Sequence, residues 1–254
     1  MFRAIVVLML VALMWSPARA ADNKYDVLAK ALAPFINVLA EKTKNPNRAM
    51  SLVARVERLT GLPPELAGAR AELDLQYPDR LRIRGPLLGE QVTACRNGQQ
   101  LWAIPGERLQ AALDLAVAQR KLPKPDPKAR LEPFRLPLPQ KQLVFLPALF
   151  DVADAGFESL DGVENRVLDL TLMPELDRQL EQRGWHGRLW IRPDGKPARL
   201  VVARPGWELA VRFEKVAFAP RLPDATWEPP ADAASGVLTL DAPRFQQLLR
   251  AIVK

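Results

Sequence analysis

The chain has 254 residues, 48% of them hydrophobic, and a formal net charge of +7. One histidine and one cysteine are too few for a metal site of the usual His/Cys kind. The positive charges are spread along the chain, whereas nucleic-acid-binding proteins typically gather them in one patch, so we expect no nucleic-acid partner.

Residues 1–20 have the pattern of a secretory signal peptide. Arg3 supplies the positive start, residues 4–15 form a short apolar run, and Ala18-Arg19-Ala20 is a small-x-small cleavage site. We expect cleavage after Ala20 and a location in the periplasm; a signal anchor that stays attached is the alternative. Removing these 20 residues from 254 leaves 234, which we assign to a single domain over 21–254, and it removes two arginines, which leaves a net charge of +5.

The first expected element is a helix that begins at a cap, Asp22 or Asn23, and runs to about Lys42. Its apolar residues recur at helical spacing, as Tyr25, Leu28, Leu32, Phe35, Ile36 and Leu39. The helix is either an ordinary amphipathic helix on a core or a lid over a cavity. Two strands follow, over 51–60 and 71–77, each with apolar and polar residues in alternation.

Residues 77–106 carry the clearest pattern in the chain, that of short strands with one apolar face. Leu81 and Ile83 alternate with arginines, which predicts a sheet with one dry and one wet face. Asn97-Gly98 predicts a hairpin turn, because both central residues tolerate positive φ. Cys95 lies within one of these strands, and we expect it to be a buried apolar residue.

A helix is expected over 107–119, and a proline-rich segment follows over 121–147. Its seven prolines prevent regular helix and deny a sheet its donors. The segment is either a domain linker or an ordered loop that crosses the mouth of a cavity. Apolar residues such as Phe134, Phe145 and Leu146 favour the loop, because a solvated linker would be polar.

Strands return in the C-terminal half. Residues 157 and 167–173 flank the Asp161-Gly162 turn, a short helix is expected over 174–184, and three antiparallel strands are expected over 187–192, 199–204 and 207–218. Asp241 is expected to cap a final helix over 242–254. The predicted fold class is α+β: a strongly curved antiparallel sheet in up-and-down order, an incomplete β-barrel, with helices and a loop lid over its concave face.

The sequence contains no recognisable set of catalytic residues. His186 has no local partner for a triad, and Ser51, Ser159 and Ser235 lie outside any nucleophile elbow. No glycine-rich phosphate loop is present. We therefore expect neither enzyme activity nor a cofactor, with a carboxylate-only hydrolase as the remaining catalytic alternative.

Three blocks of the sequence resemble the LolA/LolB family, the periplasmic carrier and the outer-membrane receptor of bacterial lipoproteins. The first block is LQYPDRLRI at 75–83, and the second is VTACRNGQQLW at 92–102. The third combines LWIRPDG at 189–195 with residues 213–218 and with WEPP at 227–230. Together the blocks span most of the chain after residue 20.

This resemblance implies an incomplete β-barrel whose concave face takes acyl chains beneath a lid. The residues assigned to the cavity lining are Leu52, Val56, Leu73, Leu75, Tyr77, Leu81, Ile83, Leu189, Ile191, Leu209, Val211 and Phe213. The residues assigned to the lid are Leu32, Ile36, Leu113, Phe145 and Leu146. The alternative is that these side chains pack a solid core.

One position departs from the family pattern. The carrier has an arginine directly before the proline of the first block, which the resemblance assigns to fastening the lid, whereas this chain has Tyr77 there. A phenol donates a hydrogen bond but carries no permanent charge.

The function that the resemblance implies is a periplasmic carrier that shelters acyl chains of a lipoprotein or lipid for transfer between the inner and outer membranes. The implied partners are the acyl chains, an inner-membrane releasing complex, an outer-membrane acceptor and, transiently, the membrane surface; we expect a monomer. The alternative is a sensor or adaptor similar to RseB, which binds a protein partner and regulates a stress response.

Overall fold

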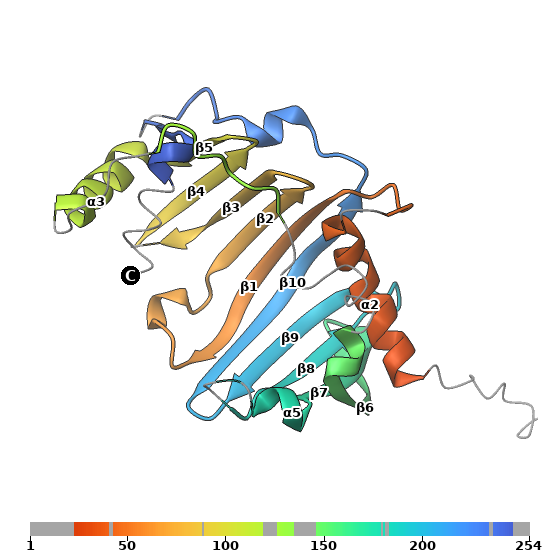
Figure 1. Cartoon of the computed structure of the whole chain (residues 1–254). Coiled ribbons are helices and arrows are strands. Elements are labelled where there is room, and N and C mark those ends of the chain that lie inside the picture. Colours follow the sequence, from red (N-terminus) through yellow and green to blue (C-terminus); the bar gives the residue numbers. More distant parts are fainter. Residues whose placement is uncertain are drawn as a thin grey trace, which may run out of the picture.

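One antiparallel sheet of eleven strands dominates the structure, which is a computed structural model of the chain (Figure 1). The expected signal peptide, much of the proline-rich segment and the end of the C-terminal helix lie outside the residues that it describes. These residues are 23–40, 43–87, 89–118, 126–134, 146–178, 180, 183–233 and 236–245.

The strands form two meanders that meet in the middle of the sheet. The first contains β1 (Ala49–Thr60), β2 (Arg70–Gln76), β3 (Arg80–Leu87), β4 (Glu90–Asn97) and β5 (Gln100–Ile104). The second contains β6 (Phe150–Leu160), β7 (Val163–Leu172), β8 (His186–Ile191), β9 (Pro197–Arg204) and β10 (Trp207–Ala219). A short strand, β11 (Leu238–Leu240), adds to the outer edge of β5.

The strand order is β11-β5-β4-β3-β2-β1-β10-β9-β8-β7-β6. The curved antiparallel α+β fold predicted above is therefore confirmed, but a simple up-and-down order is wrong at one point. The chain leaves β5 near one edge of the sheet, enters β6 at the other edge, and returns to place β10 beside β1. This central pairing runs from Ala49 opposite Ala219 to Thr60 opposite Glu208.

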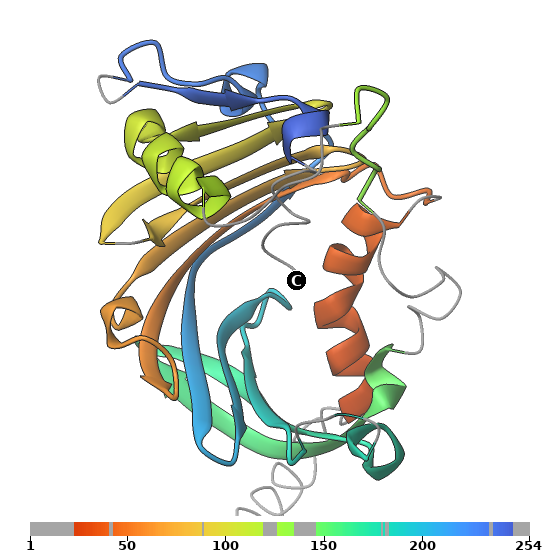
Figure 2. The same cartoon turned by 60° about the vertical axis from the view of Figure 1, so that its left-hand side comes forward.

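Helix α2 (Lys24–Leu39) lies on the concave side of this curved sheet (Figure 2). Asn23 caps it by accepting a hydrogen bond from the Tyr25 N–H at 3.2 Å, as expected for one of the two candidate caps. The first half of the helix packs Leu28 and Ala31 on β6, β7 and β8, and the second half packs Val38 against Met50 and Leu75 on β1 and β2. The helix thus joins the two halves of the sheet.

Helix α3 (Gly106–Ala118) lies beside β5 and β11 at the edge of the sheet and agrees with its predicted bounds within one residue. Its first residue approaches β11 very closely. A Cβ on Gly106 would lie 2.5 Å from the Leu238 backbone nitrogen, so only glycine fits there. Three short 3₁₀ turns complete the described elements: η1 (Pro64–Leu66), η2 (Leu146–Leu149) and η3 (Asp224–Trp227).

The predicted turns and short helices have mixed outcomes. Asp161 and Gly162 have φ values of 53° and 76°, which is the geometry of a tight hairpin turn between β6 and β7. The helix expected over 174–184 is wrong in length, because α5 covers only Pro174–Asp177. The Asp177 carboxylate accepts hydrogen bonds from the N–H groups of Gly184 and Trp185, which holds this segment as a loop. Asp241 caps helical residues 242–245 as predicted, by accepting from the Arg244 N–H at 2.9 Å.

The opposite, convex face carries a small apolar cluster under η3. Trp102 donates a hydrogen bond from Nε1 to the Trp227 carbonyl at 2.8 Å, and Cys95 packs beside both tryptophans. Cys95 is 3% exposed, and burial raises the pKa of its thiol to about 11, which confirms the expected buried residue. Among the helices that the structure describes, none has the length and apolar character needed to cross a bilayer.

Candidate binding site on the concave face

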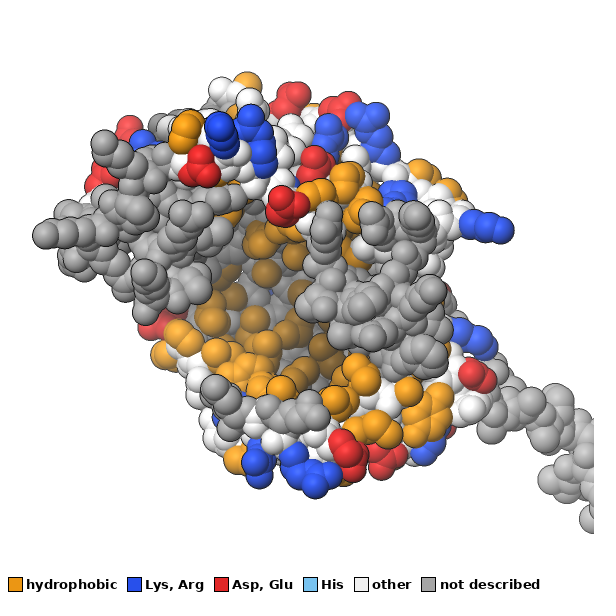
Figure 3. Space-filling view, in the orientation of Figure 1, with side chains coloured by type: hydrophobic (Ala, Val, Ile, Leu, Met, Phe, Trp, Pro, Cys, Tyr) orange, Lys and Arg blue, Asp and Glu red, His pale blue; other side chains and the backbone are white. Residues whose placement is uncertain are grey.

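Apolar side chains form one continuous face along the inside of the sheet. Residues directly opposite each other in neighbouring strands share a face. The register places Leu52 opposite Leu73, and Leu73 opposite Ile83. On the other half of the sheet, Val202 lies opposite Leu209, and Leu209 opposite Leu59. Figure 3 shows the result as a hollow whose visible floor is hydrophobic.

Helix α2 covers two parts of this face, one over β6, β7 and β8 and one over β1 and β2. Leu189 and Ile191 are 6% and 4% exposed beneath the first half of the helix, and Leu75 is 7% exposed beneath the second half. Three residues assigned to the lining from sequence therefore lie in packed clusters. Leu189 and Ile191 belong to the first α2 cluster, beneath the first half of the helix, and Leu75 belongs to the second α2 cluster, beneath the second half. Leu81, Leu52 and Leu73 adjoin the second cluster as partly buried side chains.

Other parts of the apolar face belong to neither of these two clusters. Val56 on β1 and the β10 residues Leu209, Val211 and Phe213 are half-buried and belong to neither cluster. Ile83 on β3 is 45% exposed. These five of the assigned lining residues thus offer apolar surface that α2 leaves uncovered.

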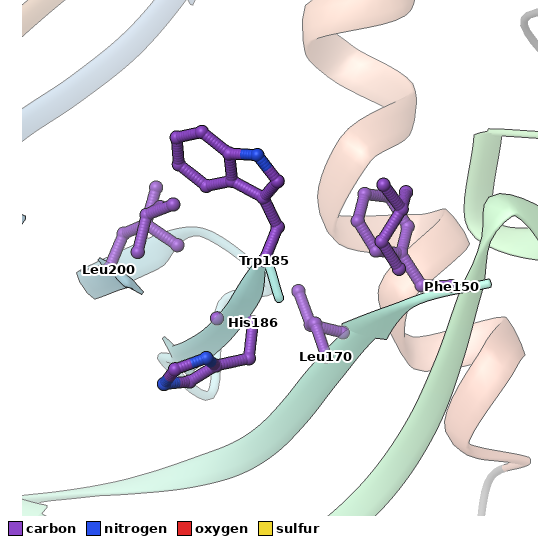
Figure 4. Close-up of a pocket in the computed structure, with 8 residues that line it drawn as sticks. Phe150, Leu170, Trp185, His186 and Leu200 are labelled. Carbon is purple, nitrogen blue, oxygen red and sulfur yellow. The ribbon is translucent and has the colours of Figure 1, made fainter. Parts of the chain in front are cut away.

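A pocket of about 360 Å³ opens beside the first α2 cluster, at the ends of β7, β8 and β9 (Figure 4). Its volume lies at the lower end of the range of small-ligand pockets, about 300–1,000 Å³. Register connects it to the uncovered face, because Leu200 lies opposite Val211. The pocket is lined by Phe150, Leu170, Leu172, Trp185, His186, Gly187, Leu200 and Val202.

His186 contributes little polarity to this pocket. Its ring is turned away from the side chains of Trp185 and Leu170 (Figure 4), and its Nδ1 atom lies 3.2 Å from the Gly184 carbonyl oxygen. The side chains that face the pocket are therefore almost entirely apolar, as for a site that holds a hydrocarbon chain.

Trp185 lines the pocket, and Trp207 and Arg204 contact its ring, so we call these three residues the rim of the pocket. The rings of Trp185 and Trp207 meet edge to face, with centroids 5.4 Å apart. The Arg204 guanidinium carbon lies 5.3 Å from the centroid of the Trp185 ring, within the range of a cation–π contact.

The position that departs from the family pattern takes part in holding the end of α2. The Arg48 guanidinium carbon lies 4.2 Å from the centroid of the Tyr77 ring, and Arg48 Nη1 donates to the Asn37 carbonyl in the last turn of α2 at 3.2 Å. The Tyr77 N–H in turn donates to the Arg48 carbonyl at 3.0 Å. Tyr77 therefore lies at the end of the sheet beneath α2, away from the pocket.

The residues assigned to the lid are dispersed. Leu32 packs against the first α2 cluster, and Ile36 is half-buried on the same helix. Leu113 lies on α3, whose sheet neighbours are β5 and β11. Phe145 and the side chain of Leu146 lie outside the described part of the chain.

Residues 126–134 of the proline-rich segment are bound to the end of the sheet. The Leu131 N–H donates to the Gln99 side chain at 2.8 Å, and its carbonyl accepts from Arg96 at 3.1 Å. The Phe134 N–H donates to the Pro78 carbonyl at 2.8 Å, in the turn between β2 and β3. This part of the segment is therefore an ordered strap on the sheet.

Among the described residues, the polar groups around Ser51 lie apart from His186. Ser51 donates a hydrogen bond to the Asp74 carboxylate, which also accepts from Arg82, and His186 lies on a distant strand. No group of three or more His, Cys, Asp or Glu residues that could hold a metal occurs within the described ranges.

The pocket residues on β6, β7 and β9 are not among those assigned to the lining from the sequence. Leu200 and Val202 belong to a strand that is apolar on both faces, because Val201 packs on the outer face near Trp190. The sequence of this strand therefore lacks the alternation of apolar and polar residues that marks an inner face. The Pro205-Gly206 turn was the available signal, since it places Val202 opposite the assigned Leu209. Nothing in the local sequence marks Trp185.

No known family model matches the sequence, and no curated protein sequence matches it. Three solved structures illustrate the likeness at the level of fold. The lipoprotein LppX of Mycobacterium tuberculosis is 14% identical, with a TM-score of 0.42, and the alignment covers 78% of this chain and 96% of LppX. A LolA superfamily protein, NE2245 from Nitrosomonas europaea, is 14% identical, with a TM-score of 0.28, over 82% of this chain and 99% of that one.

The third is the MucA/MucB complex of Pseudomonas aeruginosa, which is 16% identical with a TM-score of 0.40. The alignment covers 82% of this chain but only 62% of that one. At these identities the likenesses concern the fold alone.

Proposed function

We propose that this chain is a binding protein of the periplasm that holds an acyl chain of a lipid or lipoprotein in its concave hollow, without catalysis. The observation that carries the proposal is the apolar pocket of about 360 Å³ and its continuity with the uncovered face of β1 and β10. Burial of about ten methylenes gains about 8 kcal/mol before the costs of association. A ligand can therefore be held reversibly without a covalent bond.

The loop next to the pocket supports transient contact with a membrane surface. Leu172 and Trp185 both line the pocket, and the segment between them includes Met173 and Leu180, which are 41% and 43% exposed. Exposed apolar side chains beside a pocket entrance are typical of interaction sites. Collection from an inner-membrane releasing complex and delivery to an outer-membrane acceptor complete this proposal.

A fluorescent fatty acid tests the proposal, with variants that separate the open face from the packed clusters. Leu209→Arg places a charge on the uncovered face, and we expect a folded protein that no longer takes up the probe. Leu189→Arg places the charge beneath α2, and we expect it to prevent folding, because an unpaired buried charge is strongly destabilising. Leu209→Met keeps volume and apolar character and should retain uptake.

Circular dichroism establishes folding for each variant before the uptake assay. The proposal is refuted if the wild-type chain takes up no probe and carries no lipid detectable by mass spectrometry. A wild-type chain that binds no lipid but captures an envelope protein would instead support the sensor or adaptor function.

A further inference from the structure

We propose that the pocket is selective for an amphiphile with an anionic head, a carboxylate or a phosphate, and that Arg204 at its rim binds this head. The inference rests on the proposed function and adds to it the chemical class of the ligand. The tail would occupy the apolar pocket, and the oxyanion would lie where the guanidinium meets the aromatic rim.

The register places Arg204 on the pocket side of the sheet. Arg204 is the last residue of β9 and lies opposite Trp207, two residues beyond the pocket residue Val202, which lies opposite Leu209. Residues two apart in a strand share a face. The contact of the guanidinium with the Trp185 ring then places the positive charge directly beside a wall of the pocket.

The guanidinium of Arg204 has no protein counter-ion among the described residues. Its Nε atom is buried and has no hydrogen-bond partner. By contrast, arginines on the outer face are paired: Arg199 on the same strand binds Glu57, and Arg188 on β8 binds Asp169. A buried donor on a charged group is costly to leave unsatisfied, so an oxyanion that accepts from it is favoured.

One carboxylate described on the adjoining loop, that of Asp177, is engaged elsewhere. Asp177 accepts hydrogen bonds from the Gly184 N–H at 2.9 and 3.0 Å, through its two oxygens, and a further one from the Trp185 N–H at 3.4 Å. These contacts hold Trp185 at the rim and leave Arg204 available to a ligand. The planar guanidinium matches carboxylate and phosphate oxygens, whereas a neutral alcohol head offers it only a weak partner.

Three ligands with the same sixteen-carbon chain test the inference: palmitate, palmitoyl lysophosphatidate and hexadecanol. Each is titrated into the full chain, with displacement of the neutral dye Nile red as the readout. Arg204→Gln should weaken palmitate or lysophosphatidate by about 10- to 100-fold, the range of a hydrogen bond to a charged group, and leave hexadecanol unchanged. The matched control is Arg199→Gln, the same substitution on the outer face of the same strand, which should change none of the three affinities.

If Arg204→Gln loses affinity for palmitate alone, the site binds a carboxylate head. If it loses affinity for lysophosphatidate alone, the site binds a phosphate head, and if it loses affinity for both, the site binds oxyanions in general. Unchanged affinities in Arg204→Gln, or equal losses for all three ligands, would overturn the inference. If Arg204→Gln does not fold, the wild-type chain decides alone, because equal affinities for palmitate, lysophosphatidate and hexadecanol refute a charged head site. Failure of the wild type to bind any of the three would refute the proposed function itself.

Discussion

The contact between α2 and the sheet leads to a stability prediction for Leu28→Ala. Leu28 lies in the first half of the helix and is 1% exposed, within a cluster that includes Val152 and Leu168, both fully buried. Alanine removes most of this side chain but keeps good helix propensity. Any loss of stability then reports the packing of α2 on the concave face.

The expected loss in the free energy of unfolding is about 2–5 kcal/mol, the range for buried leucine-to-alanine changes. The upper part of that range applies where the surroundings cannot collapse into the cavity. Strands β6, β7 and β8 are hydrogen-bonded into one sheet beneath Leu28, so they have little freedom to move into the cavity that alanine would leave. For a chain of this size, such a loss lowers the melting temperature by roughly 4–20 °C.

Urea denaturation followed by circular dichroism measures the difference. Leu115→Ala on α3 is the matched control, because Leu115 is a helical leucine that is 64% exposed. The control should change stability by no more than about 0.5 kcal/mol. Equal, small effects of the two substitutions would show that α2 does not pack on the sheet in solution.

Two further predictions concern the convex face and the edge of the sheet. Cys95 should react slowly with a thiol reagent at pH 8 in the native protein and rapidly in urea, because burial raises its pKa to about 11; fast native labelling would contradict its burial. Arg166 holds the pKa of Asp154 below its usual value, so this pair stabilises the fold above the carboxyl's unfolded pKa and ceases to do so as pH falls through the folded value. Asp154→Asn should therefore lower stability at pH 7, and this loss should shrink as the pH falls below the unfolded pKa of the carboxyl; a loss that stays the same at low pH would exclude the ion pair as the cause.

Local patterns were sufficient to predict most of the elements. Alternation predicted the strands, and Asp161-Gly162 predicted a turn that the structure contains, because its two residues tolerate positive φ. The same reasoning was misled between Pro174 and Gly184. There, the side chain of Asp177 binds backbone groups seven and eight residues further on and ends the helix early.

The candidate site was predictable only in part, because alternation identifies a face but not what covers it. Leu189 and Leu209 look equivalent in the sequence, yet the first is buried under α2 and the second remains half-buried. The pocket exists because α2 covers only part of the concave face. Its rim requires Trp185 and Arg204 to meet, and these residues are 19 positions apart in the sequence.

The sequence by itself determined which side chains face each way along the strands, because the period of two is a property of the extended backbone. It also determined the Asp161-Gly162 turn and the helix caps Asn23 and Asp241, where each residue acts on its near neighbours. Only the tertiary structure decided that β10 lies beside β1, that α2 covers two parts of the concave face, and that the buried Nε atom of Arg204 has no hydrogen-bond partner among the described residues. These features depend on contacts between distant segments, whose free energy is set by the surface that they bury together rather than by any local pattern.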